Sequence, residues 1–151
     1  MNYLLWTAVI LFTIVLQGSF SLFDITPNFT VIIAYYAGIK KGRFPGLAVG
    51  SLIGLIQDFL SGAFLGPNFL GKGLVGYLSS SVYNGFFIWT RLLGVISMLV
   101  LTATDSLIIF LSKSVFNVMP ASFGTAALII AVQSLVNAPL GAVIRPDEQA
   151  R

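Results

Sequence analysis

Three ionisable residues interrupt otherwise apolar stretches of this sequence, and their chemistry is the natural starting point. They are Asp58, Lys72 and Asp105. A charged side chain costs about 2.5 to 3.5 kcal/mol at the centre of a transmembrane helix, so it is kept there only with a partner or a function. At a helical rise of about 1.5 Å per residue, all three fall within roughly 10 Å of the same side of the bilayer. We therefore expect one intramembrane polar cluster.

Opposite charges are expected to hold this cluster together. Antiparallel packing of the helices that carry Asp58 and Lys72 would bring these two side chains close, and Asp105 would join them from a third helix. An ion pair or a triad would compensate the burial of the charges. Three interpretations stay open: a polar clasp that fixes helix register, a site for a ligand, proton or substrate, and a Lys72 side chain that merely extends to the membrane interface.

Few residues of the chain are suited to catalysis. Cysteine and histidine are both absent, which excludes disulfides, thiol nucleophiles, Cys/His metal sites and imidazole bases. Ser79, Ser80 and Ser81 are eligible nucleophiles, but the nearest base, Lys72, lies two helical turns away. The sequence therefore predicts a protein that is not an enzyme and that uses no metal or cofactor.

A stripe of glycines leads to the first carboxylate. Gly46, Gly50, Gly54 and Asp58 recur every fourth residue, and Gly62 continues the spacing. On a helix these residues share one narrow face, which allows another helix to approach closely. This face is either an ordinary packing surface inside the bundle or the docking surface of a separate transmembrane partner.

The elements that must position these residues are apolar runs long enough to enter a bilayer. Apolar residues make up 57% of the 151 residues and charged residues 9%, whereas soluble domains have about 45 to 50% and about 25%. Six apolar runs are present, at residues 4–23, 26–41, 44–60, 69–89, 92–111 and 121–144. We predict an all-α polytopic membrane protein, a compact six-helix bundle over residues 1–145 with a short cytoplasmic tail at 146–151.

Individual runs carry local signals. The first could be a signal peptide, but it lacks a basic n-region and is longer than a typical h-region. The second is short and is expected to begin at Thr26, a capping residue followed by proline. Pro139 is expected to kink or end the sixth run. Gln133 and Asn137 share a face of that run, which is typical of a hydrogen bond between helices.

The basic residues indicate the orientation. Six crossings with a cytoplasmic N-terminus place most of them inside, namely Lys40, Lys41, Arg43, Arg91, Arg145 and Arg151. Lys113 then lies in an outer loop, and both termini are cytoplasmic. The net charge of +3 is explained by this bias, so we expect the lipid bilayer as a partner and no nucleic acid.

The segment from Pro45 to Tyr83 resembles the MreD family, the rod shape-determining proteins of the bacterial inner membrane. The likeness is carried by the glycines of the third run together with Asp58, Leu60, Ser61, Gly62, Leu65, Gly66, Gly76 and Tyr77. The compact size, Asn28, the short second run and the basic turn at 40–43 extend it over nearly the whole chain. Lys72 departs from the family pattern, so the resemblance transfers no role to it.

This resemblance implies a scaffold of the cell-elongation complex. The partner would be the transmembrane segment of an MreC-like single-pass protein, which connects to MreB, RodA and a class B penicillin-binding protein during lateral peptidoglycan synthesis. The substrate-binding subunits of vitamin importers are similar in their six-helix architecture. The alternative function is therefore a small-molecule-binding subunit of a vitamin-type importer, with Asp58, Lys72 and Asp105 as the floor of its pocket.

Overall fold

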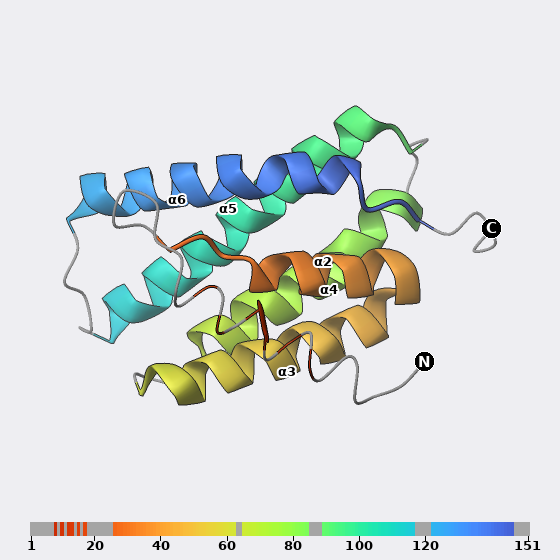
Figure 1. Cartoon of the computed structure of the whole chain (residues 1–151). Coiled ribbons are helices and arrows are strands. Elements are labelled where there is room, and N and C mark those ends of the chain that lie inside the picture. Colours follow the sequence, from red (N-terminus) through yellow and green to blue (C-terminus); the bar gives the residue numbers. More distant parts are fainter. Residues whose placement is uncertain are drawn as a thin grey trace.

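The protein is a bundle of helices in a computed structural model (Figure 1). The structure describes residues 26–62, 65–84, 89–116 and 122–146, together with Ala8, Ile10, Phe12, Thr13, Val15 and Gln17, which are helical. The elements of the described part are α2 (Thr30–Lys41), α3 (Arg43–Ser61), α4 (Pro67–Asn84), α5 (Arg91–Val115), α6 (Phe123–Asn137) and the 3₁₀-helix η1 (Ala138–Ala142). No strand occurs among these residues, which confirms the predicted helical class.

Three helical stretches in the described part of the chain are long and apolar enough to cross a membrane. They are Arg43–Ser61, Arg91–Val115 and Phe123–Ala142. The helix α2 has 12 residues, which gives it a length of about 18 Å and leaves it short of a hydrocarbon core of about 30 Å. The fold is thus that of a polytopic helical membrane protein. The full set of six crossings stays a prediction, because most of the first run lies outside the described residues.

The starts of α5 and α6 follow from capping side chains. The Thr90 hydroxyl accepts a hydrogen bond from Leu93 N at 3.1 Å, which caps α5, and Ser122 caps α6 in the same way. The second run has no side-chain cap. Its helix was expected to start at Thr26 but starts at Thr30, because the polar groups of residues 26–28 bond to distant helices, as described below.

The helix ends follow from glycine and proline. Gly42 ends α2 with φ of 97° and Gly62 ends α3 with φ of 61°, a left-handed conformation that glycine adopts without strain. The α-helical part of the sixth run ends at Asn137, and η1 continues through Pro139, as predicted from the missing proline donor. The fourth run was expected to extend to Trp89, but Trp89 and Thr90 are not helical, and residues 85–88 lie outside the described part.

The core lies where α2, α4 and α5 meet. Its apolar residues are Val31, Ala34, Tyr35, Ile39, Val75, Met98 and Leu101. The hydroxyl groups of Tyr35 and Ser97 share a hydrogen bond of 2.7 Å within this core. The helix α4 packs against α2, α3 and α5, whereas α6 packs against α5 and η1. The outer surface carries large exposed apolar side chains on every full-length span, Phe59, Leu92 and Phe123 among them, as expected of a surface that faces lipid.

Candidate functional site

The glycine stripe of α3 lies inside the bundle. A Cβ atom built on its members would overlap the backbone of α4, at the carbonyl oxygens of Gly76 (for Gly46), Lys72 (for Gly50) and Asn68 (for Gly54). The two backbones therefore touch along three helical turns, with no side chain between them. In the described structure this face is a packing surface between α3 and α4.

Asp58, at the end of this stripe, caps the N-terminus of α4. Its carboxylate accepts backbone N–H groups of Gly66 at 2.8 Å, Asn68 at 3.1 Å and Phe69 at 3.1 Å. The Asn68 side chain donates a fourth hydrogen bond, from Nδ2 at 2.8 Å. The first N–H groups of a helix have no partner within it and attract negative charge. Asp58 thus supplies, from the preceding helix, the cap that α4 lacks in its own sequence.

The ion pair of the cluster joins α4 to α5. Lys72 Nζ lies 3.4 Å from Asp105 Oδ2, and both side chains are 0% exposed. Nζ also donates to Asn68 Oδ1 at 2.8 Å. The expected pairing of Lys72 with Asp58 is therefore indirect: Asn68 stands between them and bonds to both. The three charged residues do lie in one cluster, as their depth in the membrane predicted. The ion pair, however, joins Lys72 to Asp105 and not to Asp58.

Asp105 contacts groups from two other parts of the chain, the segment before α2 and α4. Its Oδ2 accepts a hydrogen bond of 2.6 Å from Asn28 Nδ2, in the segment before α2. Thr30 in turn donates to Asn28 Oδ1 at 3.1 Å. Oδ1 of Asp105 faces Gly71 of α4, where a Cβ atom would overlap it. A glycine at position 71 is thus what allows the carboxylate to lie against α4.

The network continues into α6. Asn137 Nδ2 donates to the backbone carbonyl of Asn28 at 2.9 Å, and Gln133 Nε2 donates to that of Thr26 at 2.8 Å. Ser106 Oγ on α5 donates to Gln133 Oε1 at 2.8 Å. The two amides that share a face of α6 therefore serve as donors to the segment before α2, and Gln133 also forms the expected bond between helices.

One continuous polar chain therefore runs from α3 to α6. It consists of Asp58, Asn68, Lys72, Asp105, Asn28 and Asn137, which lie on α3, α4, α5, α6 and the segment before α2. Asn28 and Asn68 were not among the predicted site residues. The signal for Asn68 was its position four residues before Lys72, on the same helical face. Asn28 entered the sequence analysis only through the family resemblance, because its partners in the cluster, Asp105 and Asn137, lie 77 and 109 residues further along the chain.

The arrangement is suited to fixing helix register rather than to catalysis. The hydrogen-bonding atoms of the cluster are mostly used by one another, and both charged groups of the ion pair are enclosed. The structure's described part contains no group of three His, Cys, Asp or Glu residues that could hold a metal ion. A separate groove of about 520 Å³ lies between α5 and α6, and it is lined by apolar side chains and Ser134 but by none of the three charged residues.

A comparison with known families agrees with this architecture. The profile of the family described as rod shape-determining protein MreD matches residues 1–141. The chain belongs to the MreD family. Its membership, together with the three apolar spans, makes it an integral protein of the inner membrane with a role in rod-shape determination. The MreD family is a structural, shape-determining one. No curated protein and no solved structure matches the chain.

Proposed function

We propose that this MreD-family chain is a membrane scaffold of the cell-elongation complex. Its direct partner is the transmembrane segment of an MreC-like single-pass protein, and its indirect partners are MreB, RodA and a class B penicillin-binding protein. The match to the MreD family over residues 1–141 carries this proposal. The role is to hold partners in place during lateral peptidoglycan synthesis, without turnover of its own.

The short connections of the bundle support an interface within the bilayer. A single residue, Gly42, separates α2 from α3, and residues 62–66 separate α3 from α4. Such connections offer little surface for specific contacts outside the membrane, whereas the outer helix faces are large and apolar. Because α4 covers the glycine stripe of α3, the partner must contact a lipid-facing surface instead.

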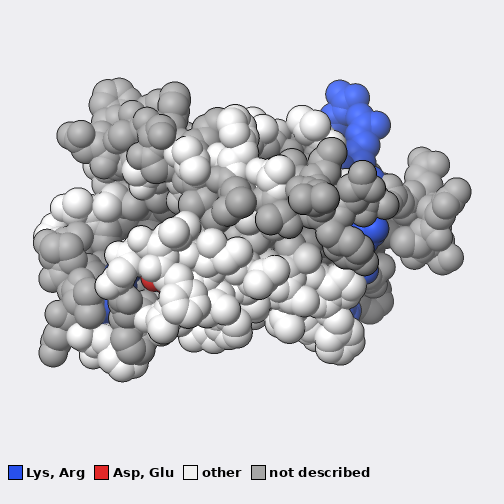
Figure 2. Space-filling model, turned by 60° about the horizontal axis from the view of Figure 1, so that its bottom comes forward, with Lys and Arg blue, Asp and Glu red and all other residues white. Residues whose placement is uncertain are grey.

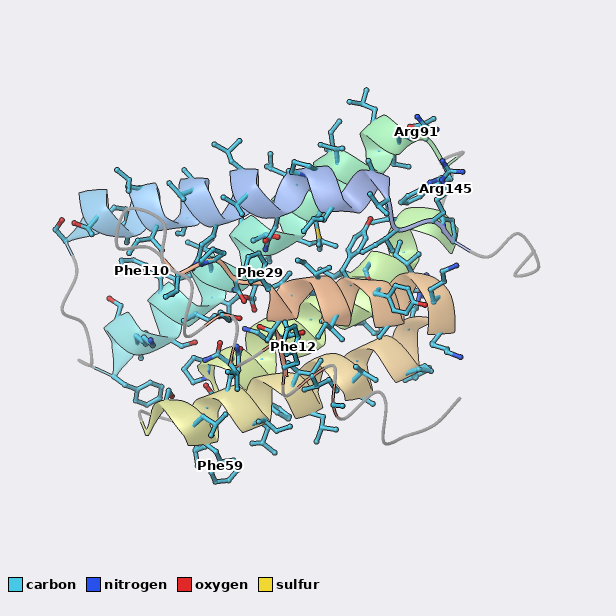
Figure 3. All side chains as sticks on the ribbon, in the orientation of Figure 1. Phe12, Phe29, Phe59, Arg91, Phe110 and Arg145 are labelled. Atoms are coloured by element: carbon cyan, nitrogen blue, oxygen red, sulfur yellow. The ribbon has the colours of Figure 1, made fainter. Side chains whose placement is uncertain are left out.

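The topology belongs to the same proposal. Six crossings form one bundle over residues 1–145, the tail at 146–151 is cytoplasmic, and so is the N-terminus. The positions of the basic residues support this arrangement. Arg91 and Arg145 lie at one end of the described bundle (Figure 3), and Lys41 and Arg43 flank the α2–α3 junction, which lies at the same end (Figure 1).

The alternative, a small-molecule subunit of a vitamin-type importer, is not favoured. It requires the charged cluster to form the floor of an open pocket. Lys72 and Asp105 are instead fully enclosed and paired with each other, and the Asp58 carboxylate accepts four hydrogen bonds from Gly66, Asn68 and Phe69 of the chain itself. The MreD match also favours the shape-determining role.

Crosslinking in native membranes tests the scaffold. A photo-activated amino acid is placed at Ala127 or Ala131 on α6, and at Leu52 or Phe59 on α3, all of which are exposed. The full chain is co-expressed with the partner's transmembrane segment or, as a control, with an unrelated transmembrane helix of equal length. We expect crosslinks to the partner from one face of the bundle and none to the control. A folded protein that crosslinks to neither helix, particularly one that purifies with a stoichiometric small molecule, would contradict the proposal.

A further inference from the structure

The exposed basic side chains of the described part gather at one end of the bundle. The four are Lys41, Arg43, Arg91 and Arg145. Figure 2 shows most of the blue atoms at one end of the surface, with a small blue area and a red spot toward the other end, and Figure 3 places Arg91 and Arg145 at the first end. This set is called the basic end below.

The chain supplies little negative charge to the basic end. The two described carboxylates, Asp58 and Asp105, are buried. They lie 15 and 14 residues along α3 and α5 from Arg43 and Arg91, a distance of about 20 Å in a helix. In the sequence, Asp147 and Glu148 follow Arg145, but the six basic residues at positions 40–43, 91, 145 and 151 outnumber them.

Two helix N-termini add to the positive charge. Both α3 and α5 begin at the basic end, each with an arginine as its first residue and with no acidic residue in its first turn. A helix N-terminus carries about half a positive charge and is normally stabilised by acidic side chains. The N-cap of α3 is Gly42, which offers no side chain. Among the described residues, neither helix start has an acidic side chain in its first turn to balance this charge, which leaves the basic end suited to an external anion.

A close backbone contact holds the start of α5, which carries Arg91, against the C-terminal segment, which carries Arg145. A Cβ atom at Gly94 would overlap the carbonyl oxygen of Gly141, and the reverse is also true. Arg91 precedes Gly94 by three residues, and Arg145 follows Gly141 by four. The start of α5 and the residues after η1 are thus held together by the fold, with both arginine side chains exposed.

We propose that the basic end binds the phosphate groups of anionic phospholipids, with Arg91 and Arg145 as the principal contacts. Guanidinium groups bind phosphate through paired hydrogen bonds. The basic end is formed by the ends of two membrane-spanning helices, α3 and α5, so lipid headgroups are the anions that lie at this level. Lipid is chosen over an acidic protein because the described basic side chains lie at the ends of these apolar spans and not on an extramembrane domain.

Lipid retention by the purified full chain tests this site. The protein in detergent is titrated with phosphatidylglycerol or with phosphatidylcholine of the same acyl chains, and bound lipid is counted by native mass spectrometry. Each basic residue near an anionic surface contributes about fivefold in affinity. We therefore expect the variant with Arg91→Gln and Arg145→Gln to bind phosphatidylglycerol about 25-fold more weakly, with unchanged binding of phosphatidylcholine. The matched control is Lys113→Gln, which removes one positive charge at the other end of α5.

Further variants separate the site from a general effect. The charge-preserving variant with both arginines replaced by lysine should keep most of the preference for phosphatidylglycerol, and far-ultraviolet circular dichroism checks that every variant is folded. Equal binding of the two lipids by the wild-type protein would overturn the proposal. So would a double glutamine variant that is folded and retains the preference. Binding of an acidic peptide but not of phosphatidylglycerol would also overturn it and would assign the basic end to a protein partner.

Discussion

Loss of one member of the Lys72–Asp105 pair should cost more stability than loss of both. The perturbation is a double-mutant cycle built from Lys72→Met, Asp105→Asn and their combination. Lys72→Met leaves the Asp105 carboxylate enclosed with Asn28 as its donor, and Asp105→Asn leaves the ammonium group with Asn68 alone. In either variant one charge stays buried without an opposite charge in direct contact.

The contacts allow the magnitude to be worked out. Removing one partner of a buried ion pair costs about 3 to 5 kcal/mol, and we expect the lower end, about 3 kcal/mol, because the unfolded state in a micelle or bilayer also finds polar partners. The double variant loses the hydrogen bonds to Asn68 and Asn28, at about 1 kcal/mol each. It should therefore be more stable than either single variant by about 1 kcal/mol, which gives a coupling energy of roughly 3 to 4 kcal/mol.

The assay is equilibrium unfolding in mixed micelles, followed by circular dichroism, for the wild-type chain and its variants. A second cycle with Asp58→Asn and Lys72→Met is the matched comparison, because Asp58 reaches Lys72 only through Asn68. Its coupling energy should stay below about 1 kcal/mol. Additive effects in the Lys72–Asp105 cycle, or a larger coupling in the Asp58 cycle, would refute the assignment of the ion pair.

Three further predictions concern packing, capping and topology. Gly50→Leu should prevent the bundle from folding, because α3 and α4 touch at this position. The control Ala48→Leu, on the exposed side of α3, should be tolerated. Gel filtration in detergent measures folding, and a folded Gly50→Leu variant would contradict the packing of α3 against α4. Thr90→Ala should cost about 1 kcal/mol in the same unfolding assay, through loss of the α5 cap, and an unchanged midpoint would count against that cap. A cysteine at Ser61 should react with an impermeant reagent in intact cells and one at Lys41 only after permeabilisation, and the reverse pattern would exclude the proposed orientation.

The sequence predicted the helices well where the chain carries its own boundary signals. The third run was placed at residues 44–60 and α3 spans Arg43–Ser61, because Gly42 and Gly62 mark its two ends. Pro139 marked the end of α6 for a similar local reason. The start of α2 was missed, since Thr26 and Pro27 form a plausible cap, while the actual conformation of residues 26–28 depends on Gln133 and Asn137, far along the chain.

The depth of the candidate site in the membrane could be predicted from the sequence, but not which of its side chains form the ion pair. Helical rise gives the height of Asp58, Lys72 and Asp105 in the membrane, and this placed them near one another. It does not give the rotation of α5 about its axis, which decides that Asp105 faces Lys72. Nor does it show that Asp58 turns its carboxylate to the backbone of α4. Those choices depend on helix packing, which one sequence does not specify.

The segment before α2 has a consequence for the order in which the protein is made. Its carbonyl groups at Thr26 and Asn28 receive their hydrogen bonds from residues 107 and 109 positions later in the chain. A ribosome synthesises the N-terminal part first, so these carbonyls enter the membrane before their donors exist. An unpaired carbonyl is costly in hydrocarbon, so the helices inserted first cannot pack completely before α6 is present. Insertion of α6 supplies the missing donors and completes the packing of the bundle.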